Sequence, residues 1–453
     1  MDLHTLLPDA YRLLRDPAAF SGRVTNVPLR AYQLDIARAV LDSVLHRRGL
    51  TFAVMMSRQA GKNETAAQLE ALLLMLFRDC GGWIVKASPT FQPQALHSLL
   101  RLEARLQNPW TAGSWRREHG QMVRLGNARA LFLSAQARAS VVGATASILL
   151  EADEAQDIPE DKWNKDLRPM GASANVTTVL WGTAWTPDTL LAHTVQSLRA
   201  QEQQDGMRRV FAVPWERVAA EVPGYGAYVR AEIARLGETH PIIRSQYALE
   251  ELQTCSRLFP ETRQALMRGH HLAHAEPQGD CRYALLVDVG GQAAAGETEP
   301  QASVLGEAAD ETRACTAATL VQIEVVHEEP LAGRPRYLVV QRWWWRGLAQ
   351  ADLYARLLAL YQRWSPALIV VDATGVGEGV SSFLTQRLGE RVRPFVFTGQ
   401  SKSQLGWSFL AVCDTGRFRD HAPDGSPAQA EFWRQVAAAD YELKPGAART
   451  LRW

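Results

Sequence analysis

The chain has 453 residues, with 49 Lys and Arg against 48 Asp and Glu, which gives a formal net charge of +1. Apolar residues make up 47% and charged residues 21%, an ordinary globular composition that argues against a disordered protein. At roughly 150 residues per domain, two or three domains are expected. The near-zero net charge neither favours nor excludes a polyanionic partner, because a nucleic-acid-binding face is local.

The five cysteines are far apart and form no Cys-x-x-Cys pair. This spacing favours a reducing compartment and argues against a zinc ribbon or a disulfide scaffold. The N-terminus, Met-Asp-Leu-His-Thr, lacks a basic region followed by an apolar one, and apolar stretches such as 71–77 are too short to cross a bilayer. We therefore expect a soluble, cytoplasmic protein.

From about residue 50 to 215, short β-branched segments alternate with longer amphipathic ones. This alternation predicts a doubly wound α/β domain with crossover helices. Strands are expected at 51–56, 83–87, 147–152 and 176–182, a hairpin at 122–134 around Gly126-Asn127, and helices at 63–78 and 92–107.

The pattern changes after a predicted helical stretch at 227–252. Three strands, a helix and a fourth strand are then expected, at 282–288, 316–326, 337–342, 349–364 and 367–372. This β-β-β-α-β order is typical of a ribonuclease H-like sheet. We therefore predict an N-terminal domain over 1–255, a linker over 256–280 and a C-terminal domain over 281–453. A mobile loop is expected at 290–313.

The first candidate site follows the strand 51–56, in the sequence Ser57-Arg58-Gln59-Ala60-Gly61-Lys62-Asn63-Glu64. A tight loop with Gly-Lys at a helix start presents backbone N–H groups and a lysine to a phosphate chain, as in a P-loop. Two positions depart from the strict pattern: Met56 stands where Gly is expected, and Asn63 replaces the Ser or Thr that binds Mg²⁺. Taken alone, the loop leaves a chance match open.

An apolar strand that ends in Asp153-Glu154 strengthens the P-loop interpretation. A carboxylate at the end of a strand beside the P-loop strand can hold Mg²⁺, and a second one can orient the attacking water. A solvated acidic turn is the alternative for the acidic pair alone. Loop and acidic pair together favour ATP hydrolysis.

Further candidates border this site. Tyr32 could stack on adenine and Gln33 could hydrogen-bond its edge, although an ordinary helix start explains both equally well. Thr183, at the end of the strand 176–182, could sense the γ-phosphate, and a simple strand end is the alternative. Arg138 or Arg58 could stabilise transition-state charge.

A second candidate site lies in the C-terminal half, where Asp288 ends the first predicted strand and Asp372 the fourth. These strands are neighbours in a ribonuclease H-like sheet, so the two carboxylates would meet. They would repel each other unless a divalent cation lay between them, and two such cations can promote phosphodiester hydrolysis. Two unrelated strand caps are the alternative. Later acids, none in a clear helical acidic motif, are Asp414, Asp420, Asp424 and Asp440.

Taken in order, these segments resemble the large terminase subunit of tailed bacteriophages. The resemblance covers nearly the whole chain and is carried by Tyr32-Gln33, 57–64, 149–155, 181–183, 286–288 and 371–378. It implies an N-terminal P-loop (ASCE-type) doubly wound ATPase domain followed by a ribonuclease H-like mixed-sheet nuclease domain. The implied activity is ATP-driven translocation of double-stranded viral DNA into a procapsid, with metal-dependent cutting of concatemeric DNA.

The resemblance also implies roles for individual residues. ATP would be bound by Tyr32, Gln33, Arg58, Gln59, Ala60, Gly61, Lys62, Asn63 and Glu64. Asp153 would hold Mg²⁺, Glu154 would be the catalytic carboxylate, Thr183 would lie in the coupling motif, and Arg138 would be an arginine finger supplied in trans. Asp288 and Asp372 would bind Mg²⁺ or Mn²⁺ at the nuclease site.

The partners that the resemblance implies are viral DNA, a portal protein, a small terminase subunit and further copies of the chain in a ring on the procapsid, with no membrane. The implied location is the host cytoplasm and, transiently, the procapsid portal, but not the mature virion.

Two departures from the family pattern bear on activity. The amide oxygen of Asn63 could still accept a metal-bound water, so we expect Mg²⁺ use to be retained, in the usual or an altered form. Large terminases carry a third nuclease acid, which is expected beyond residue 453 of a truncated chain unless the site is completed differently. We therefore expect weak or absent cleavage by this chain. The alternatives are a host translocase or helicase with a resolvase-like domain, and an inactive prophage-derived DNA-binding or portal-binding protein.

Overall fold

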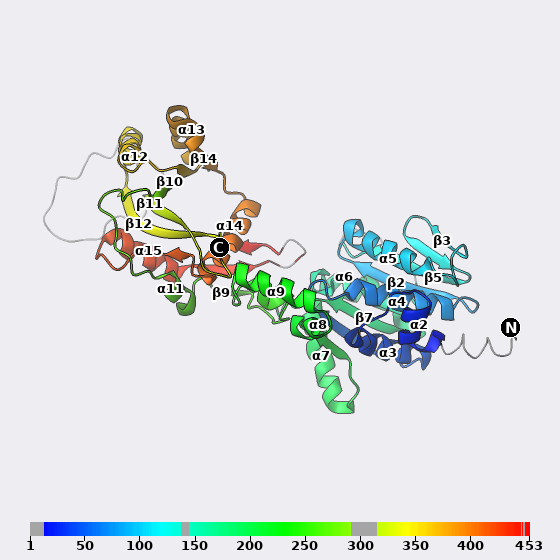
Figure 1. Cartoon of the computed structure of the whole chain (residues 1–453). Helices are drawn as coiled ribbons and strands as arrows, with labels where there is room; N and C mark the ends of the chain where they lie inside the picture. The colour runs from blue at the N-terminus through cyan, green and yellow to red at the C-terminus, as the bar shows by residue number, and fades with distance from the viewer. Residues whose placement is uncertain (1–12, 137–144, 291–314, 445, 447–448) are drawn as a thin grey trace. The chain divides into compact units, whose positions relative to one another are not determined.

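The structure is a computed structural model that describes residues 13–136, 145–290, 315–444, 446 and 449–453. The described chain forms two compact units (Figure 1). The first contains the described residues up to Arg230, Pro241–Thr254 and the segment Leu443–Arg449, and the remainder forms the second. The expected linker 256–280 thus lies within the second unit, and a segment near the end of the expected C-terminal domain packs with the first.

The first unit is built on an eight-stranded sheet in the spatial order β3-β4-β5-β2-β6-β7-β1-β8. The strands are β1 (Thr51–Met56), β2 (Gly82–Ser88), β3 (Trp115–Glu118), β4 (Met122–Leu125), β5 (Ala128–Ser134), β6 (Leu149–Ala152), β7 (Thr177–Gly182) and β8 (Val210–Val213). All neighbours from β5 to β8 in this order are parallel, and β3 and β4 add antiparallel pairs at one edge. The predicted hairpin around Gly126-Asn127 is confirmed as β4 and β5.

The expectation that the acidic strand lies directly beside the loop-bearing strand β1 is wrong. The acidic strand β6 does not lie beside β1, because β7 runs between them: Leu180 pairs with Ala53 on one side and with Ala152 on the other. An extra strand between the loop-bearing strand and the acidic strand is the arrangement of the ASCE-type fold, which is thereby confirmed. With a spacing of ~4.8 Å between strands, β1 and β6 lie about 10 Å apart, a gap that two long side chains can bridge.

Helices cover both faces of this sheet, because its central strands are apolar on both sides. Phe52 and Val54 of β1 join a core that contains side chains of α2 to α5, whereas Ala53 and Met55 join one that contains side chains of α7. The helices that begin in this unit are α2 (Pro17–Arg23), α3 (Ala31–Leu45), α4 (Lys62–Leu76), α5 (Leu96–Leu106), α6 (Glu160–Lys162), α7 (Leu190–Asp205), α8 (Trp215–Glu221), α9 (Pro223–Leu236) and α10 (Pro241–Gln246).

Two expected helices have different bounds in the structure. The stretch 227–252 is broken, because Gly237 adopts a left-handed φ of 92° after α9 and Pro241 begins the separate helix α10. In the stretch 92–107 a single π-turn, Phe91–Ala95, precedes α5.

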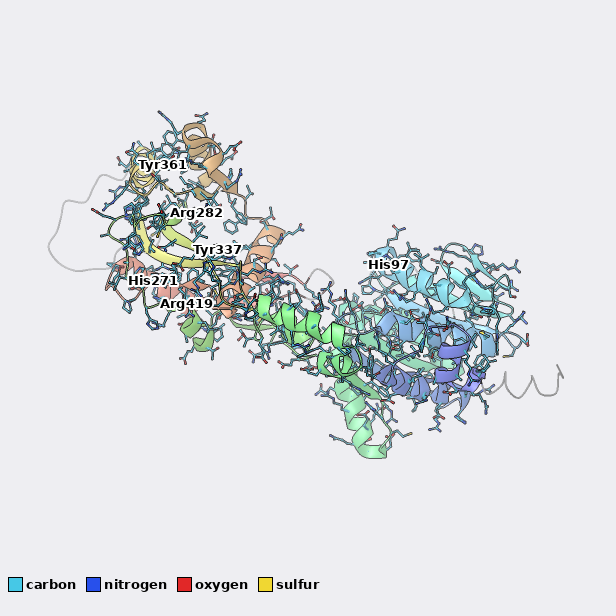
Figure 2. All side chains as sticks on the ribbon, viewed as in Figure 1. His97, His271, Arg282, Tyr337, Tyr361 and Arg419 are labelled. Carbon is cyan, nitrogen blue, oxygen red and sulfur yellow. The ribbon has the colours of Figure 1, made fainter. Side chains whose placement is uncertain are left out.

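The second unit contains a six-stranded sheet in the order β14-β13-β10-β11-β12-β15. The strands are β10 (Arg282–Asp288), β11 (Cys315–Val325), β12 (Pro335–Arg346), β13 (Leu368–Asp372), β14 (Val392–Phe395) and β15 (Phe418–Arg419). β10, β11 and β12 pair antiparallel, and β13 pairs parallel to β10 after the crossover helix α12 (Gln350–Trp364). The predicted ribonuclease H-like sheet is confirmed. At its edge Arg419 of β15 lies beside β12, the strand of Tyr337 (Figure 2).

The remaining elements of the second unit pack around this sheet. They are α11 (Glu261–Met267), α13 (Gly377–Leu388), α14 (Gly399–Asp414), α15 (Pro427–Ala438) and a small sheet of β9 (Cys255–Arg257), β16 (Asp440–Leu443) and β17 (Leu451–Arg452). The predicted loop 290–313 lies outside the described residues from 291 onward. None of the helices in the described ranges is both long enough and apolar enough to cross a bilayer.

Candidate functional site

The loop Ser57–Gly61 carries the chain from β1 into α4, whose first residue is Lys62. Gly61 caps this helix with a φ of 92°, in the left-handed region that favours glycine. A Cβ atom added to Gly61 would lie 2.5 Å from Gln33 Nε2, so a side chain would collide there as well. The first N–H groups of α4 have no partner within the helix, which makes its start a position for an anion.

Tyr32 and Gln33, the two adenine candidates, lie buried beneath this loop. The Tyr32 hydroxyl donates a hydrogen bond to the Ala60 carbonyl (2.9 Å), and Gln33 Nε2 donates one to the Gly61 carbonyl (3.1 Å). Gln33 Oε1 also accepts from the backbone N–H of Arg30 at the start of α3 (2.9 Å). Both side chains therefore hold the loop in shape, and a contact with adenine stays a prediction.

A cavity of about 650 Å³ opens above the loop, within the range of small-molecule sites. It is lined by Met56, Ser57, Arg58, Gln59, Gly61, Lys62, Asn63, Glu64, Gln94, Arg101, Glu154, Asp157, Thr183, Gln246 and Arg449. Most of the predicted loop residues, together with Glu154 and Thr183, therefore share one cavity. Arg138 lies outside the described residues.

Lys62 bridges the loop and the acidic strand end. Its Nζ donates to Glu154 Oε1 and lies 3.4 Å from Asp153 Oδ1. Burial opposes the charged form of Lys62, but the two carboxylates outweigh it, so the pKa of Lys62 is raised. Burial likewise opposes the charge on Asp153, yet Lys62 and Lys86 leave its pKa lowered. Lys62 and Asp153 are thus both charged at neutral pH although both side chains are nearly buried.

Asn63 and Asp153 are the two candidate oxygen ligands of Mg²⁺. Asn63 lines the cavity, whereas Asp153 is buried and is not among the lining residues. Asn63 Oδ1 is buried and has no hydrogen-bond partner among the described residues. Asp153 holds its carboxylate in place through Ser98, whose Oγ donates to Oδ2 (3.0 Å). Mg²⁺ beside a phosphate chain keeps several waters and needs only one or two protein oxygens. The departure at Asn63 therefore leaves a side-chain oxygen without a partner among the described residues, on a residue that lines the cavity.

Gln156, which no sequence motif singles out, connects Glu154 to the end of β7. Its Nε2 donates to Glu154 Oε2 (2.7 Å), and its Oε1 accepts from the Thr183 backbone N–H (3.1 Å). A Cβ atom on Gly182 would lie 2.2 Å from Gln156 Oε1, so glycine is required for this approach. Glu154 itself has a left-handed φ of 51°. Hydrogen bonds thus hold Glu154, Gln156 and the Thr183 backbone together at the ends of β6 and β7.

Arg58 and Arg449 bring two further cationic side chains to the cavity. Arg58 Nη1 donates to Gln246 Oε1 (3.1 Å). Arg449 comes from the segment Leu443–Arg449, and its Nη2 donates to Thr183 Oγ1 (3.0 Å). Nothing in the sequence singles out Arg449, because it stands in no motif and lies 266 residues from Thr183.

A buried charge network lies below the acidic strand end. Lys86 Nζ donates to Glu70 Oε1 (2.9 Å), and Trp181 Nε1 donates to Glu151 Oε1 (2.8 Å). Burial raises the pKa of Glu151; the Lys86 charge opposes this effect and Glu70 reinforces it. Burial also opposes the charge on Lys86, but Glu70 and Glu151 outweigh it, so the pKa of Lys86 is raised. The signal in the sequence was a charge within each of two apolar strand segments, Trp83–Ala87 and Ile148–Ala152.

In the second unit, Asp288 and Asp372 meet as predicted from the strand order. Val287 pairs with Val371 in the parallel ladder of β10 and β13, so the two aspartates leave the sheet at the same level. Burial and the neighbouring Asp372 charge raise the pKa of Asp288. The Asp372 carboxylate also accepts from the Thr374 backbone N–H (2.8 Å). Two carboxylates that repel each other in this way are suited to a divalent cation.

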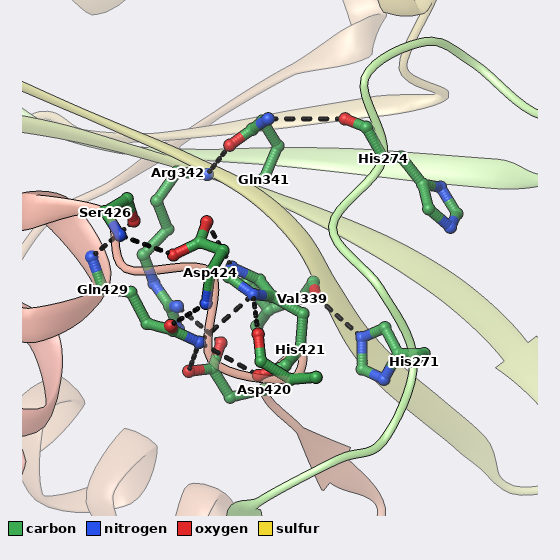
Figure 3. Close-up of polar contacts among 11 residues, drawn as sticks. His271, His274, Val339, Gln341, Arg342, Asp420, His421, Asp424, Ser426 and Gln429 are labelled. Carbon is green, nitrogen blue, oxygen red and sulfur yellow. Dashed lines mark hydrogen bonds and ion pairs between the residues drawn. The ribbon is translucent and has the colours of Figure 1, made fainter.

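The described residues contain no group of three or more Asp, Glu, His or Cys side chains arranged to hold a metal. Asp420 lies too far along the sheet to act together with Asp288 and Asp372. It is fully buried just after β15, the edge strand at the opposite end of the sheet from β13 and β14. There Arg342 Nη1 donates to one carboxylate oxygen and Gln429 Nε2 to the other (3.1 Å) (Figure 3).

The other three later acids also have partners away from β10 and β13. Asp414 accepts two hydrogen bonds from Arg263, and Asp424 accepts from the Ser426 backbone N–H (2.8 Å). Asp440 lies 3.5 Å from Arg257 in an exposed ion pair. In the part of the chain that the structure describes, the candidate metal site at β10 and β13 therefore has two acids.

Replacing Lys86 by Met is expected to destabilise the first unit by about 3–5 kcal/mol, because Glu70 and Glu151 would remain buried without a cation. Hydrogen exchange of the β2 and β6 amides measures this change. The double variant Lys86→Met, Glu70→Leu should recover much of the loss. Lys165→Met is the control, since that side chain is 73% exposed, and equal losses in both single variants would contradict the network.

Asp157 should make the first unit more stable at low pH. Burial raises the pKa of Asp157 to about 6, against the opposing charge of Arg449. The folded state therefore keeps a proton that the unfolded state has lost, and this contribution, at most about 3 kcal/mol, disappears as pH rises from 4 to 6. Asp157→Asn should flatten the pH dependence of β7 amide exchange. The exposed control Asp161→Asn should not, and an unchanged slope in Asp157→Asn would refute the assignment.

Comparison with solved structures finds similarity to phage large terminases. The large terminase of a thermophilic bacteriophage is 10% identical over 93% of both chains, with a TM-score of 0.49. The HK97 bacteriophage large terminase is 12% identical over 97% of this chain and 95% of that one (TM-score 0.42). The large terminase nuclease of thermophilic phage G20c, solved with bound magnesium, is 13% identical over 43% of this chain and 85% of that one (TM-score 0.30).

No protein-family model matches the chain, and no curated protein matches it either. Each of these TM-scores is below 0.5 and each identity is far below 25%. The fold assignment therefore rests on the strand order and register of the two sheets, and the function rests on the residues of the two sites.

Proposed function

We propose that the chain is an ATP-driven motor that translocates double-stranded viral DNA into a procapsid, and that its second unit is a metal-dependent endonuclease. The observation that carries the proposal is the single cavity in which the loop 57–61, Lys62 and Glu154 come together at the carboxyl ends of an ASCE-type sheet. The ribonuclease H-like sheet with its aspartate pair adds the second activity.

In the proposed reaction, the N–H groups at the start of α4 and the Lys62 ammonium bind the phosphates of ATP. Lys62 must first leave Glu154, which frees that carboxylate to accept a proton from the attacking water. The water oxygen bonds to the γ-phosphorus, the bond to the bridging β,γ-oxygen breaks, and the proton passes from Glu154 to the released phosphate. Mg²⁺, near Asp153 and Asn63, would neutralise phosphate charge.

For the second unit, the proposal assigns Asp288 and Asp372 as ligands of Mg²⁺ or Mn²⁺. A divalent cation supplies Lewis-acid activation of a phosphodiester when it is bound. The two carboxylates would hold it at the exposed ends of β10 and β13, where a DNA backbone can approach. With two acids among the described residues, we propose that cleavage by this chain is weak.

The remaining parts of the proposal concern assembly. We propose that copies of the chain form a ring on a procapsid portal, act with a small terminase subunit and cut concatemeric DNA in the host cytoplasm. A helicase would instead unwind duplex DNA, and an inactive relic would bind without turnover, so procapsid packaging and ATPase assays separate these alternatives.

Glu154→Gln should lower ATP turnover by orders of magnitude, with and without duplex DNA, because the amide cannot accept the water proton. Nucleotide binding should persist, since the change preserves the shape of the side chain. Turnover with Mg²⁺ and binding of a fluorescent nucleotide measure the two effects. Glu160→Gln is the control, since its exposed carboxylate does not line the cavity. Turnover in Glu154→Gln equal to that of the wild type would contradict the assignment.

Mn²⁺ should bind the second unit more tightly as pH rises through the raised pKa of Asp288, because ligands must lose their protons. Asp372→Asn should weaken this binding at least tenfold and lower the pKa of Asp288. Paramagnetic resonance of free Mn²⁺ across a pH series measures both, with Asp440→Asn as control. Unchanged Mn²⁺ affinity in Asp372→Asn would rule out the site, and rapid DNA cutting by the wild type would refute the weak-cleavage proposal.

A further inference from the structure

Arg449 lines the proposed nucleotide cavity, and none of the proposed steps uses it. It lies on the segment Leu443–Arg449, which packs with the first unit although it follows nearly all of the second unit in the chain. Its guanidinium lines the same cavity as Lys62 and Glu154. The segment Leu443–Arg449 therefore places a cationic side chain at a cavity that is otherwise lined by residues much earlier in the sequence.

The side chain is held in place from two directions. Nη2 donates to Thr183 Oγ1 (3.0 Å), at the end of β7, and the guanidinium lies 4.8 Å from the ring centroid of Trp185. Both Thr183 and Trp185 are buried. A guanidinium over an indole ring is held in place by a cation–π contact. Trp185 and Thr183 thus fix the orientation of the Arg449 guanidinium.

Burial and two nearby carboxylates determine the electrostatic environment of the Arg449 guanidinium. Burial lowers the pKa of Arg449, which means that the charged form is poorly solvated, while Asp157 and Glu154 offset part of this cost. Glu154 is already engaged by Lys62 and Gln156. A phosphate group in the cavity would stabilise the buried guanidinium further, because guanidinium and phosphate oxygens form paired, charge-assisted hydrogen bonds.

The other arginines that line the cavity are placed differently. Arg101 Nη1 donates to Glu64 Oε2 (3.1 Å), so its charge is compensated. Arg58 lies on the loop itself and donates to the neutral amide of Gln246. Arg449 approaches from the side of Thr183 and Glu154, where the terminal phosphate and the attacking water of the proposed reaction would lie.

We propose that Arg449 is a catalytic arginine supplied in cis, which binds the terminal phosphate of ATP and stabilises the charge that develops on it during hydrolysis. This inference rests on the proposed function. An arginine in this role contributes roughly 10³-fold or more to kcat. It also exchanges a hydrogen bond to Thr183 for one to phosphate, so the end of β7 would respond to the state of the nucleotide.

The test compares Arg449→Met, which keeps much of the aliphatic stem over Trp185, with Arg449→Lys and the control Arg452→Met. Arg452 lies three residues away, and its side chain is 72% exposed. Arg449→Met should lower kcat roughly 10³-fold, weaken binding of a non-hydrolysable ATP analogue about tenfold and leave ADP affinity unchanged. Arg449→Lys should restore part of kcat, and Arg452→Met should stay within about twofold of the wild type.

A mixing experiment tests the cis assignment. Lys62→Ala and Arg449→Met are each expected to be inactive, and a mixture should remain inactive, because each complete site needs both residues on one chain. Recovery of turnover in the mixture would show an arginine acting in trans and overturn the proposal. So would wild-type kcat in Arg449→Met, or equal losses of ADP and ATP-analogue affinity. Absence of turnover in the wild type would instead refute the proposed function itself.

Discussion

The ion pairs of Lys62 with Asp153 and Glu154 are the interaction on which the proposed nucleotide site depends. The loop on β1 and the acidic end of β6 are separated by β7, so backbone contacts alone do not join them. Lys62 spans that gap with a side chain that is only 11% exposed, and it meets an Asp153 side chain that is 4% exposed. Charges this deeply buried are stable only when paired, and the pairing therefore fixes the relative positions of the loop and the acidic residues.

The surrounding residues support this cluster from several sides. Tyr32 and Gln33 fix the carbonyls of the loop from below, and Ser98 and Gln156 orient the two carboxylates. Lys86 acts at longer range, because its charge helps to keep Asp153 ionised. The buried network around Lys86 thus contributes to the electrostatic potential at the cavity. In the proposed reaction, a bound phosphate chain would replace Glu154 as the partner of Lys62.

Much of the architecture was predictable from local pattern. Apolar runs and glycine positions located most strands within one or two residues, and the loop with its Gly-Lys pair led to the correct fold class. Asp288 and Asp372 could be paired because strand order alone brings them together. Spatial order within the first sheet was harder: no local signal shows that the later strand β7 inserts between β1 and β6.

Some site residues could not be predicted, because their roles arise from tertiary contacts. Gln156 follows the acidic pair by two residues, but only the folded chain brings its amide to Thr183. Arg449 lines the cavity because the late segment Leu443–Arg449 packs with the first unit. Asn63, by contrast, could be weighed from the sequence, and the amide oxygen considered there is buried in the structure without a partner among the described residues.

The central claim is that Lys62 exchanges Glu154 for the phosphates of a nucleotide, and equilibrium binding of a non-hydrolysable ATP analogue with Mg²⁺ tests it most directly. Lys62→Ala should weaken binding at least tenfold, because the cation that meets the phosphates is lost. Glu154→Gln should bind the analogue as tightly as the wild type or more tightly, since Lys62 no longer has to leave a carboxylate. Unchanged affinity in Lys62→Ala, or a tenfold loss in Glu154→Gln, would contradict the account.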